Sequence, residues 1–190
     1  ISIGRTKYLM NNPDKVPYVT IQLPVYNELY GMERLLDNIS EIDYPKDKLE
    51  IQVLDDSTDE TLETTAAQVA ALKSKGLDIT HICRTNREGF KAGALKEGLK
   101  IAKGEFIAIF DADFLPQKNW LKQTIPYFKD ENIGVVQTRW SHLNRNYSIL
   151  TRIQAFALDA HFTLEQVGRN RKGHFINFNG TAGVWRKKCI

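Results

Sequence analysis

The sequence predicts an α/β domain with a mostly parallel sheet flanked by helices. Short apolar runs of strand length alternate with segments whose apolar residues recur at helical spacing, which indicates strand–helix–strand crossover units. The 190 residues are enough for one sizeable core, and 42% hydrophobic with 26% charged residues is an ordinary globular composition. Polar motifs follow the first four predicted strands, at the sheet edge where parallel sheets bind ligands.

The first predicted strand covers residues 18–23 and is expected to stop at Pro24. A helix over 30–40 follows, with apolar residues at helical spacing, and Pro45 breaks the chain beyond it. The other expected strands cover 49–54, 78–83, 105–110 and 133–140, and the other expected helices cover 60–75, 91–103 and 119–128, the last bent at Pro126. Beyond this core of 18–140, residues 141–190 are expected to begin a second part of the same domain.

The second part has its own pattern. Residues 147–168 predict a long helix with one apolar side, which is either core or a surface for a membrane. A short strand over 174–178 is expected to precede a loop over 179–183.

Composition excludes several classes of protein. The net charge of +3 is too small to predict nucleic-acid binding. No stretch reaches the roughly 20 apolar residues of a membrane helix, so a soluble chain is expected. Cys83 and Cys189 make neither a disulfide framework nor a zinc site, and Cys83 is expected to be buried. The four histidines lack metal-ligand spacing and are expected to be structural or exposed. The start at Ile1 leads us to expect a fragment or a processed chain.

Asp111 and Asp113 follow the fourth predicted strand, separated by one residue. Two carboxylates at the end of a buried strand repel each other, and a divalent cation relieves that repulsion. Mg²⁺ and Mn²⁺ take oxygen ligands and bridge carboxylates to substrate phosphates. The alternative is a solvated loop with acidic caps before the next helix.

Two more motifs lie at the same edge. Asp55 and Asp56 follow the second predicted strand, where carboxylates suit a base and a ribose hydroxyl, although Ser57 or Asp59 could simply cap the next helix. Residues 87–93 (REGFKAG) place a lysine at a helix start, which favours an anion. The alternative for this segment is a glycine-containing loop with solvated basic ends.

The motifs occur in the order 23–28 (LPVYNE), 55–59 (DDSTD), 87–93 (REGFKAG) and 111–113 (DAD). In this order and spacing the chain resembles the family 2 glycosyltransferases, which have the GT-A (Rossmann-like) fold. The match covers nearly the whole chain. The segments 137–140 (QTRW) and 178–185 (FNGTAGVW) resemble the cellulose-synthase-like branch that makes β-mannan or β-glucan backbones.

The resemblance implies an inverting hexosyltransferase that uses a nucleotide-sugar donor, with GDP-mannose preferred to UDP-glucose. It places the nucleoside near Asp55 or Asp56 and the first loop, and the phosphates beside the lysine of the third motif. The positions implied for nucleotide binding are Pro24, Tyr26, Glu28, Asp55, Asp56, Lys91 and Asp111.

The resemblance also implies a metal ion and an acceptor side. Asp111 and Asp113 would hold Mg²⁺ or Mn²⁺ and the diphosphate, with Asp113 preferred as the direct ligand. Asn179, Gly180 and Thr181 would approach the acceptor, a growing polysaccharide or a lipid-linked sugar.

The family's catalytic base lies in a Thr-Glu-Asp-type motif, which is expected beyond Ile190, as is its acceptor-channel motif Gln-X-X-Arg-Trp. The chain is therefore expected to be truncated before these motifs and inactive alone in polymer synthesis. The full-length protein is expected to be integrated in a membrane with this domain on the cytoplasmic face.

Three alternatives share the early motifs. A nucleotidyltransferase would attack phosphorus and release pyrophosphate. A glycosyltransferase with a lipid-phosphate acceptor would not be expected to carry the 137–140 and 178–185 segments. A non-catalytic nucleotide-binding module would bind ligand without turnover.

Overall fold

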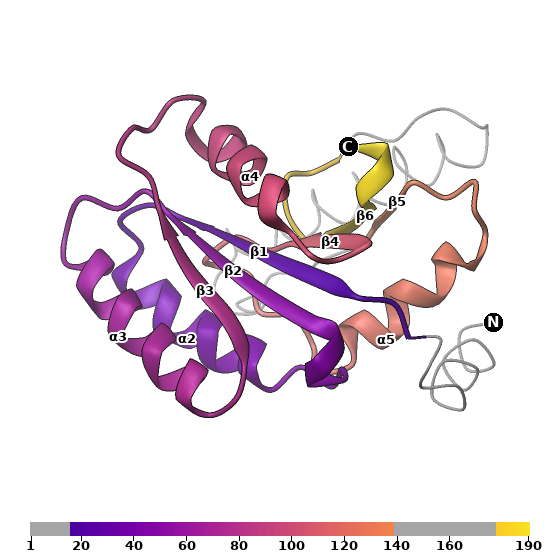
Figure 1. The fold of residues 1–190 in the computed structure, drawn as a ribbon, viewed down its shortest axis with the longest axis horizontal. Coiled ribbons are helices and arrows are strands. Elements are labelled where there is room, and N and C mark those ends of the chain that lie inside the picture. The colour runs from indigo at the N-terminus through magenta and orange to yellow at the C-terminus, as the bar shows by residue number, and fades with distance from the viewer. Residues whose placement is uncertain (1–15, 139–177) are drawn as a thin grey trace, which may run out of the picture. The chain divides into compact units, whose positions relative to one another are not determined.

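A computed structural model describes residues 16–138 and 178–190, drawn as coloured ribbon in Figure 1. Their central feature is a six-stranded sheet in the order β3-β2-β1-β4-β6-β5. Strands β1 to β4 are parallel where they pair, and β6 runs antiparallel to β4. The strands are β1 (Val19–Val25), β2 (Leu49–Asp55), β3 (Asp78–Cys83), β4 (Phe106–Ile109), β5 (Val135–Gln137) and β6 (Gly183–Arg186). The predicted mostly parallel sheet is confirmed.

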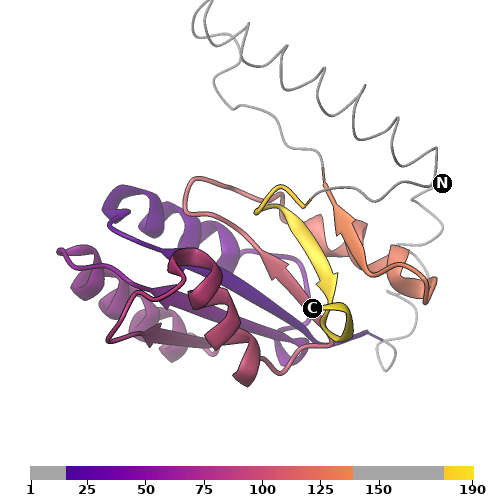
Figure 2. The same cartoon turned by 90° about the horizontal axis from the view of Figure 1, so that it is seen from above.

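Helices cover both faces of this sheet. Figures 1 and 2 show α2, α3 and α5 on one face and α4 on the other. The helices are α2 (Leu29–Ser40), α3 (Thr61–Ser74), α4 (Phe90–Ile101) and α5 (Trp120–Thr124), with short 3₁₀ helices at Lys46–Lys48, Ile125–Lys129 and Lys187–Cys189. The predicted alternation of strands and helices is therefore confirmed, with shifts of a few residues at the ends.

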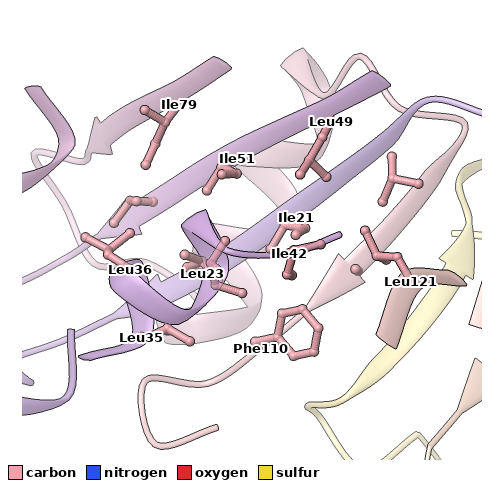
Figure 3. Close-up of a cluster of buried hydrophobic side chains, with 14 of the residues drawn as sticks. Ile21, Leu23, Leu35, Leu36, Ile42, Leu49, Ile51, Ile79, Phe110 and Leu121 are labelled. Atoms are coloured by element: carbon pink, nitrogen blue, oxygen red, sulfur yellow. The ribbon is translucent and has the colours of Figure 1, made fainter. Parts of the chain in front are cut away.

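The core lies between the sheet and α2. Alternate residues of β1 and β2 point to this face, and α2 presents four buried residues at helical spacing. Leu35 and Leu36 of α2 lie over Ile21, Leu23 and Ile51 of the sheet (Figure 3). Removal of these apolar side chains from water is the main force that holds this layer together.

The opposite face of β1 and β2 is polar although it is buried. Thr20 pairs in register with Glu50, and Gln22 pairs with Gln52. The Thr20 hydroxyl donates to the Glu50 carboxylate at 2.6 Å, and the Gln22 amide donates to the Gln52 side-chain oxygen at 3.0 Å. Each of these four side chains is at most 4% exposed. The helix that covers this face, α4, therefore packs on hydrogen-bonded side chains.

The prediction that Pro24 stops the first strand is wrong, because β1 continues to Val25. Proline lacks the N–H that a strand interior needs, so its tolerance depends on which neighbour its nitrogen faces. The backbone carbonyl of Gln22 accepts a hydrogen bond on the β4 side, and the backbone groups of residues two apart in a strand face the same neighbour, so the nitrogen of Pro24 also faces that side. The β1–β4 pairing, however, ends at Gln22. The nitrogen of Pro24 therefore points past the end of that ladder.

Two further predictions are corrected, and one strand was missed. The helix expected over 119–128 is α-helical only to Thr124 and then 3₁₀, because Pro126 removes a helical N–H. Strand β6 was not predicted at all. Cys83, expected to be buried, is exposed, since it ends β3 at the edge of the sheet and has a neighbouring strand on one side only.

The chain divides into two compact units, Ile1–Val136 with Gly180–Ile190 and Gln137–Asn179. The predicted helix over 147–168 and nearly all of the predicted strand over 174–178 lie outside the described residues. The assignment of 1–190 to one domain stays a prediction. Among the described residues, no helix has the length and hydropathy required to span a membrane.

Candidate functional site

Four loops meet at the carboxyl ends of the parallel strands, as the sequence predicts. The loop after β1 is joined to the loop after β2 by four hydrogen bonds, three of which involve Asn27. The Asn27 amide donates to the Ser57 hydroxyl at 2.9 Å, and its side-chain oxygen accepts from the Thr58 amide at 2.9 Å. Asn27 has a φ of 54°, a conformation that asparagine tolerates better than most residues. These contacts hold the predicted residues of the first and second loops side by side.

Asp55 is the last residue of β2 and is 1% exposed. Its Oδ1 accepts from the Ser57 amide at 2.8 Å, and its Oδ2 lies 2.8 Å from His81 Nε2. Burial acts to raise the pKa of Asp55, but the bonds from His81 and Ser57 outweigh it, so the pKa lies below its ordinary value. Asp55 is therefore an ionised carboxylate that holds the loop after β2 in shape.

The contact between His81 and Asp55 was missed from the sequence. Parallel pairing aligns His81 with Val53 and Cys83 with Asp55. Because Val53 and Asp55 are two residues apart in β2, their side chains share one face of the sheet, and His81 lies on that same face. Aligning the ends of the two predicted strands would have found this neighbour. The contact with Asp55 is consistent with the expectation that His81 is structural or exposed.

Asp56 lies on the other side of this loop and is bound by Arg84, the first residue after β3. Arg84 Nε donates to Asp56 Oδ1 at 2.8 Å, and Arg84 Nη2 donates to Asp56 Oδ2. The two side chains are 11% and 5% exposed, so this is a nearly buried, two-point ion pair. The chain's third motif begins just beyond it.

Asp59, the proposed helix cap, accepts a hydrogen bond from the Thr61 amide at 3.0 Å in the first turn of α3. Asp59 thus contributes to the start of the helix and leaves Asp55 and Asp56 at the sheet edge. This contact fits the capping alternative for Asp59 and leaves the nucleotide-binding role of Asp55 and Asp56 a prediction.

Lys91, near the start of α4, contacts residues far away in the sequence. Its ammonium donates to Asp111 Oδ1 and to the Gly180 carbonyl oxygen, the latter at 3.0 Å. The Asp111 amide donates to the Thr181 hydroxyl at 2.9 Å. Three predicted motifs therefore meet at one point: Lys91, Asp111 and the loop that contains Gly180 and Thr181.

Asp111 and Asp113 belong to a turn that is closed by a hydrogen bond from the Phe114 amide to the Asp111 carbonyl at 2.9 Å. Asp113 is exposed, and its carboxylate makes no hydrogen bond or ion pair with any residue in 16–138 or 178–190. The same ranges contain no cluster of three or more His, Cys, Asp or Glu that could hold a metal. Mg²⁺ and Mn²⁺ are commonly bound by one or two carboxylates, with water and substrate phosphates at the other coordination positions. The carboxylates of Asp111 and Asp113 therefore fit such an ion.

The first loop supplies an aromatic ring to the same edge. Tyr26 is 39% exposed, and the Arg87 guanidinium carbon lies 3.1 Å from its ring centroid. Glu28 is exposed beside it and precedes α2, whereas Pro24 lies within β1. Arg87 was not among the predicted site residues, although its motif was.

Asn179 lies in the second unit, where its amide donates to Gln137 Oε1 at 3.1 Å. The predicted acceptor-side residues are thus divided between the two units, with Gly180 and Thr181 in the first. Their contact with an acceptor stays a prediction.

The sequence profile described as "Glycosyl transferase family 2" matches residues 20–189. The chain is 44% identical over 179 residues to "Probable glucomannan 4-beta-mannosyltransferase 7" of Oryza sativa subsp. japonica, covering 92% of this chain and 31% of that protein. It is 43% identical to "Glucomannan 4-beta-mannosyltransferase 2" of Arabidopsis thaliana, with 92% and 34% covered. The chain spans about a third of the length of these curated relatives.

Solved structures give the same picture of the fold. "Mannosyltransferase PcManGT from Pyrobaculum calidifontis in complex with GDP-Man and Mn2+" aligns with a TM-score of 0.69 at 30% identity, over 97% of this chain and 51% of that one. S. aureus TarS in complex with UDP aligns with a TM-score of 0.60 at 20% identity, over 90% and 47%, which supports the fold alone.

Proposed function

Because the chain belongs to glycosyl transferase family 2, we propose that it provides the donor-binding part of an inverting hexosyltransferase. The donor is a nucleotide-sugar, GDP-mannose in preference to UDP-glucose. The acceptor is a growing β-linked polysaccharide.

One observation carries the proposal: Lys91, Asp111 and Gly180 meet at the sheet edge with the Asp113 carboxylate exposed on the same turn. A cation beside an acidic pair suits a diphosphate bound through a divalent ion. The side chains of Lys91 and Asp111 are 40% and 35% exposed, so a ligand can reach them from solvent.

The nucleoside is assigned to the other half of the edge. Asp56, whose two oxygens are oriented by Arg84, would accept from base or ribose donors. Tyr26, whose ring carries the Arg87 guanidinium on one face, would stack on the base. Glu28, which precedes α2, and Pro24, near the end of β1, complete this half. Asp55 supports it from behind through the Ser57 and His81 contacts.

Transfer of the hexose would break the bond between its anomeric carbon and the diphosphate while an acceptor hydroxyl attacks from the opposite face. A divalent ion held by Asp111 and Asp113 would supply Lewis-acid stabilisation to the departing nucleoside diphosphate. The Lys91 ammonium, which contacts Asp111 and Gly180, would balance the charge that develops on the same group. We assign no catalytic base among the described residues.

The choice of donor and metal rests on relatives. Proteins named glucomannan 4-beta-mannosyltransferases share 41–44% of their aligned residues with this chain, and PcManGT is described as a complex with GDP-Man and Mn²⁺. These names favour GDP-mannose, and either Mg²⁺ or Mn²⁺ fits the two carboxylates.

We extend the proposal to the whole protein through the cellulose-synthase-like resemblance. It would be integrated in a membrane, with this domain on the cytoplasmic face delivering sugar to the acceptor. Protease protection in sealed membrane vesicles tests this arrangement, since a lumenal domain would be protected from protease added outside.

Calorimetric titration of this chain with GDP and UDP, each with Mn²⁺ and with chelator, tests donor binding. We expect GDP to bind more tightly than UDP and Mn²⁺ to strengthen both. A preference for UDP would overturn the choice of donor, and affinity that is equal with chelator would overturn the metal assignment. For the full-length protein, GDP-mannose should yield GDP and a β-linked product; release of pyrophosphate would indicate a nucleotidyltransferase instead.

A further inference from the structure

Arg84 makes four hydrogen bonds that join two halves of the site. Besides its two bonds to the Asp56 carboxylate, its Nη1 donates to the Glu88 carbonyl at 2.9 Å and its Nη2 donates to the Phe90 carbonyl at 3.0 Å. One nearly buried side chain therefore ties the loop after β2 to the segment that begins α4.

The segment held by Arg84 has an unusual backbone. Gly89 and Phe90 are consecutive residues with φ of 69° and 48°. Glycine adopts this left-handed region freely, but a bulky residue such as phenylalanine rarely does. Such a conformation persists only where surrounding contacts fix it, and the bond from Arg84 to the Phe90 carbonyl is one of these contacts.

Gly93, one turn into α4, leaves room for the guanidinium. A β-carbon at this position would lie 2.7 Å from Arg84 Nη1 and 2.0 Å from the Glu88 carbonyl oxygen. Both distances are too short for any real side chain. The presence of glycine at 93 allows α4 to approach Arg84 closely.

Lys91 directly follows the strained residue Phe90. Its ammonium reaches Asp111 and the Gly180 carbonyl from the first turn of α4. A chain of direct contacts therefore runs from the Asp56 carboxylate through Arg84 and the Phe90 backbone to Lys91.

We propose that Arg84 is a positioning residue that couples the nucleoside half of the site to the diphosphate half. The inference rests on the proposed function: Asp56 lies on the nucleoside side and Lys91 on the diphosphate side. With Arg84 in place, binding at one half holds the other half in its ligand-ready geometry.

The planar fork of arginine is what this role requires. Its Nε and two Nη groups donate in fixed directions to four oxygen atoms on two different segments. A lysine would keep the positive charge beside Asp56 but could not span both segments. Arg84→Lys therefore separates charge from positioning.

A double-mutant cycle tests the coupling. GDP affinity with Mn²⁺ is measured by calorimetry for the wild-type chain, Arg84→Lys, Lys91→Ala and the double variant. We expect each single substitution to weaken binding about tenfold, the scale of one lost charge-assisted contact. The double variant should bind no more than about twofold more weakly than Lys91→Ala, which is a coupling of at least about fivefold.

Gly93→Ala tests the same role with Arg84 retained, because the added methyl group would push the start of α4 away from the Arg84 guanidinium. This variant should bind GDP more weakly, and adding Lys91→Ala to it should cause little further loss of affinity. Circular dichroism confirms that the variant is folded. Lys100→Ala is the matched control, because Lys100 is also on α4 but, among residues 16–138 and 178–190, pairs only with the exposed Glu97. The GDP affinity of this variant should equal that of the wild type.

The outcomes are distinguishable. Losses that multiply independently, to within about twofold, would show that Arg84 and Lys91 act separately and would overturn the inference. Failure of the wild-type chain to bind GDP or UDP would instead contradict the proposed function.

Discussion

Gly98 lies where α4 crosses the buried side chains of Gln22 and Gln52. A β-carbon at this position would lie 2.7 Å from Gln22 Nε2, 2.8 Å from Gln52 Oε1 and 2.8 Å from a methyl group of Leu54. Gly98→Ala must therefore move α4 away from the sheet or separate the two amides. Because the amides are 1% and 0% exposed, water cannot easily replace a bond lost between them.

The magnitude follows from three effects. Overpacking of a close-packed interior costs about 1–3 kcal/mol, and a buried polar group left without its partner costs about 1–3 kcal/mol. Alanine in a helix is more favourable than glycine by about 1 kcal/mol, which opposes both. We expect a net loss of about 2 kcal/mol in the free energy of unfolding, which lowers Tm by about 4–8 °C for a domain of this size.

Urea denaturation followed by tryptophan fluorescence measures this loss. Ala70→Gly is the control, because Ala70 is an exposed residue within α3 and reports helix propensity alone. That control should cost about 1 kcal/mol. If Gly98→Ala were as stable as the wild type, or more stable, the close contact between α4 and the amide pair would not be limiting, and the argument from packing would be refuted.

Three other substitutions probe the site. His81→Ala removes a hydrogen bond that lowers the pKa of Asp55 in the folded protein. The ionised carboxylate stabilises the fold above the ordinary pKa of 3.8, and this contribution is lost as pH falls through the lower pKa of the folded state. Acid unfolding, monitored by fluorescence, should therefore begin at higher pH in the variant. An unchanged or lower midpoint would contradict this. Asp113→Asn should abolish the effect of Mn²⁺ on GDP affinity in calorimetry while changing stability by no more than about 0.5 kcal/mol, since the side chain is exposed; a retained metal effect would exclude Asp113 as a ligand. Asp56→Asn should weaken GDP binding and cost about 1–3 kcal/mol through the Arg84 pair, with the fold retained by circular dichroism; full affinity would make Asp56 purely structural.

The alternation of strands and helices along the chain and the meeting of four loops could be predicted because both depend on local signals. Alternation of apolar runs with helical spacing gives the crossover units, and parallel strands necessarily bring their carboxyl ends to one edge. Asp56, Lys91 and Asp111 were placed at that edge by their position after a strand or at a helix start. No knowledge of side-chain direction was needed for this.

The contacts among these residues could not be predicted in the same way. Whether His81 reaches Asp55 depends on the register of β2 against β3, and whether Arg84 reaches both Asp56 and Phe90 depends on the path of a loop. Strand β6 has only four residues, which is too short for a clear apolar pattern. It pairs antiparallel with β4, so no crossover helix precedes it to indicate a strand.

The polar face under α4 was also missed, and it bears on how the site is built. Helices α2 and α4 both have twelve residues, but α2 buries four large apolar side chains whereas α4 buries only Ala94 and Gly98. Apolar packing is non-directional and accommodates small shifts, whereas hydrogen bonds have narrow limits of distance and angle.

Helix α4 is held instead by directional contacts along its length. The Arg84 guanidinium binds the segment at its start, the Lys91 ammonium binds Asp111, and the Gln22 amide donates to the Leu95 carbonyl at 3.4 Å. Each of these hydrogen bonds forms only within a narrow range of distance and angle. The absence of a side chain at Gly98 allows α4 to come close enough for Gln22 to reach the Leu95 carbonyl. Helix α4, which carries Lys91, thus depends less on the burial of large apolar side chains than α2 does. For the proposed contact between the Lys91 ammonium and a diphosphate, such a helix is a better support than one that rests on non-directional apolar contacts.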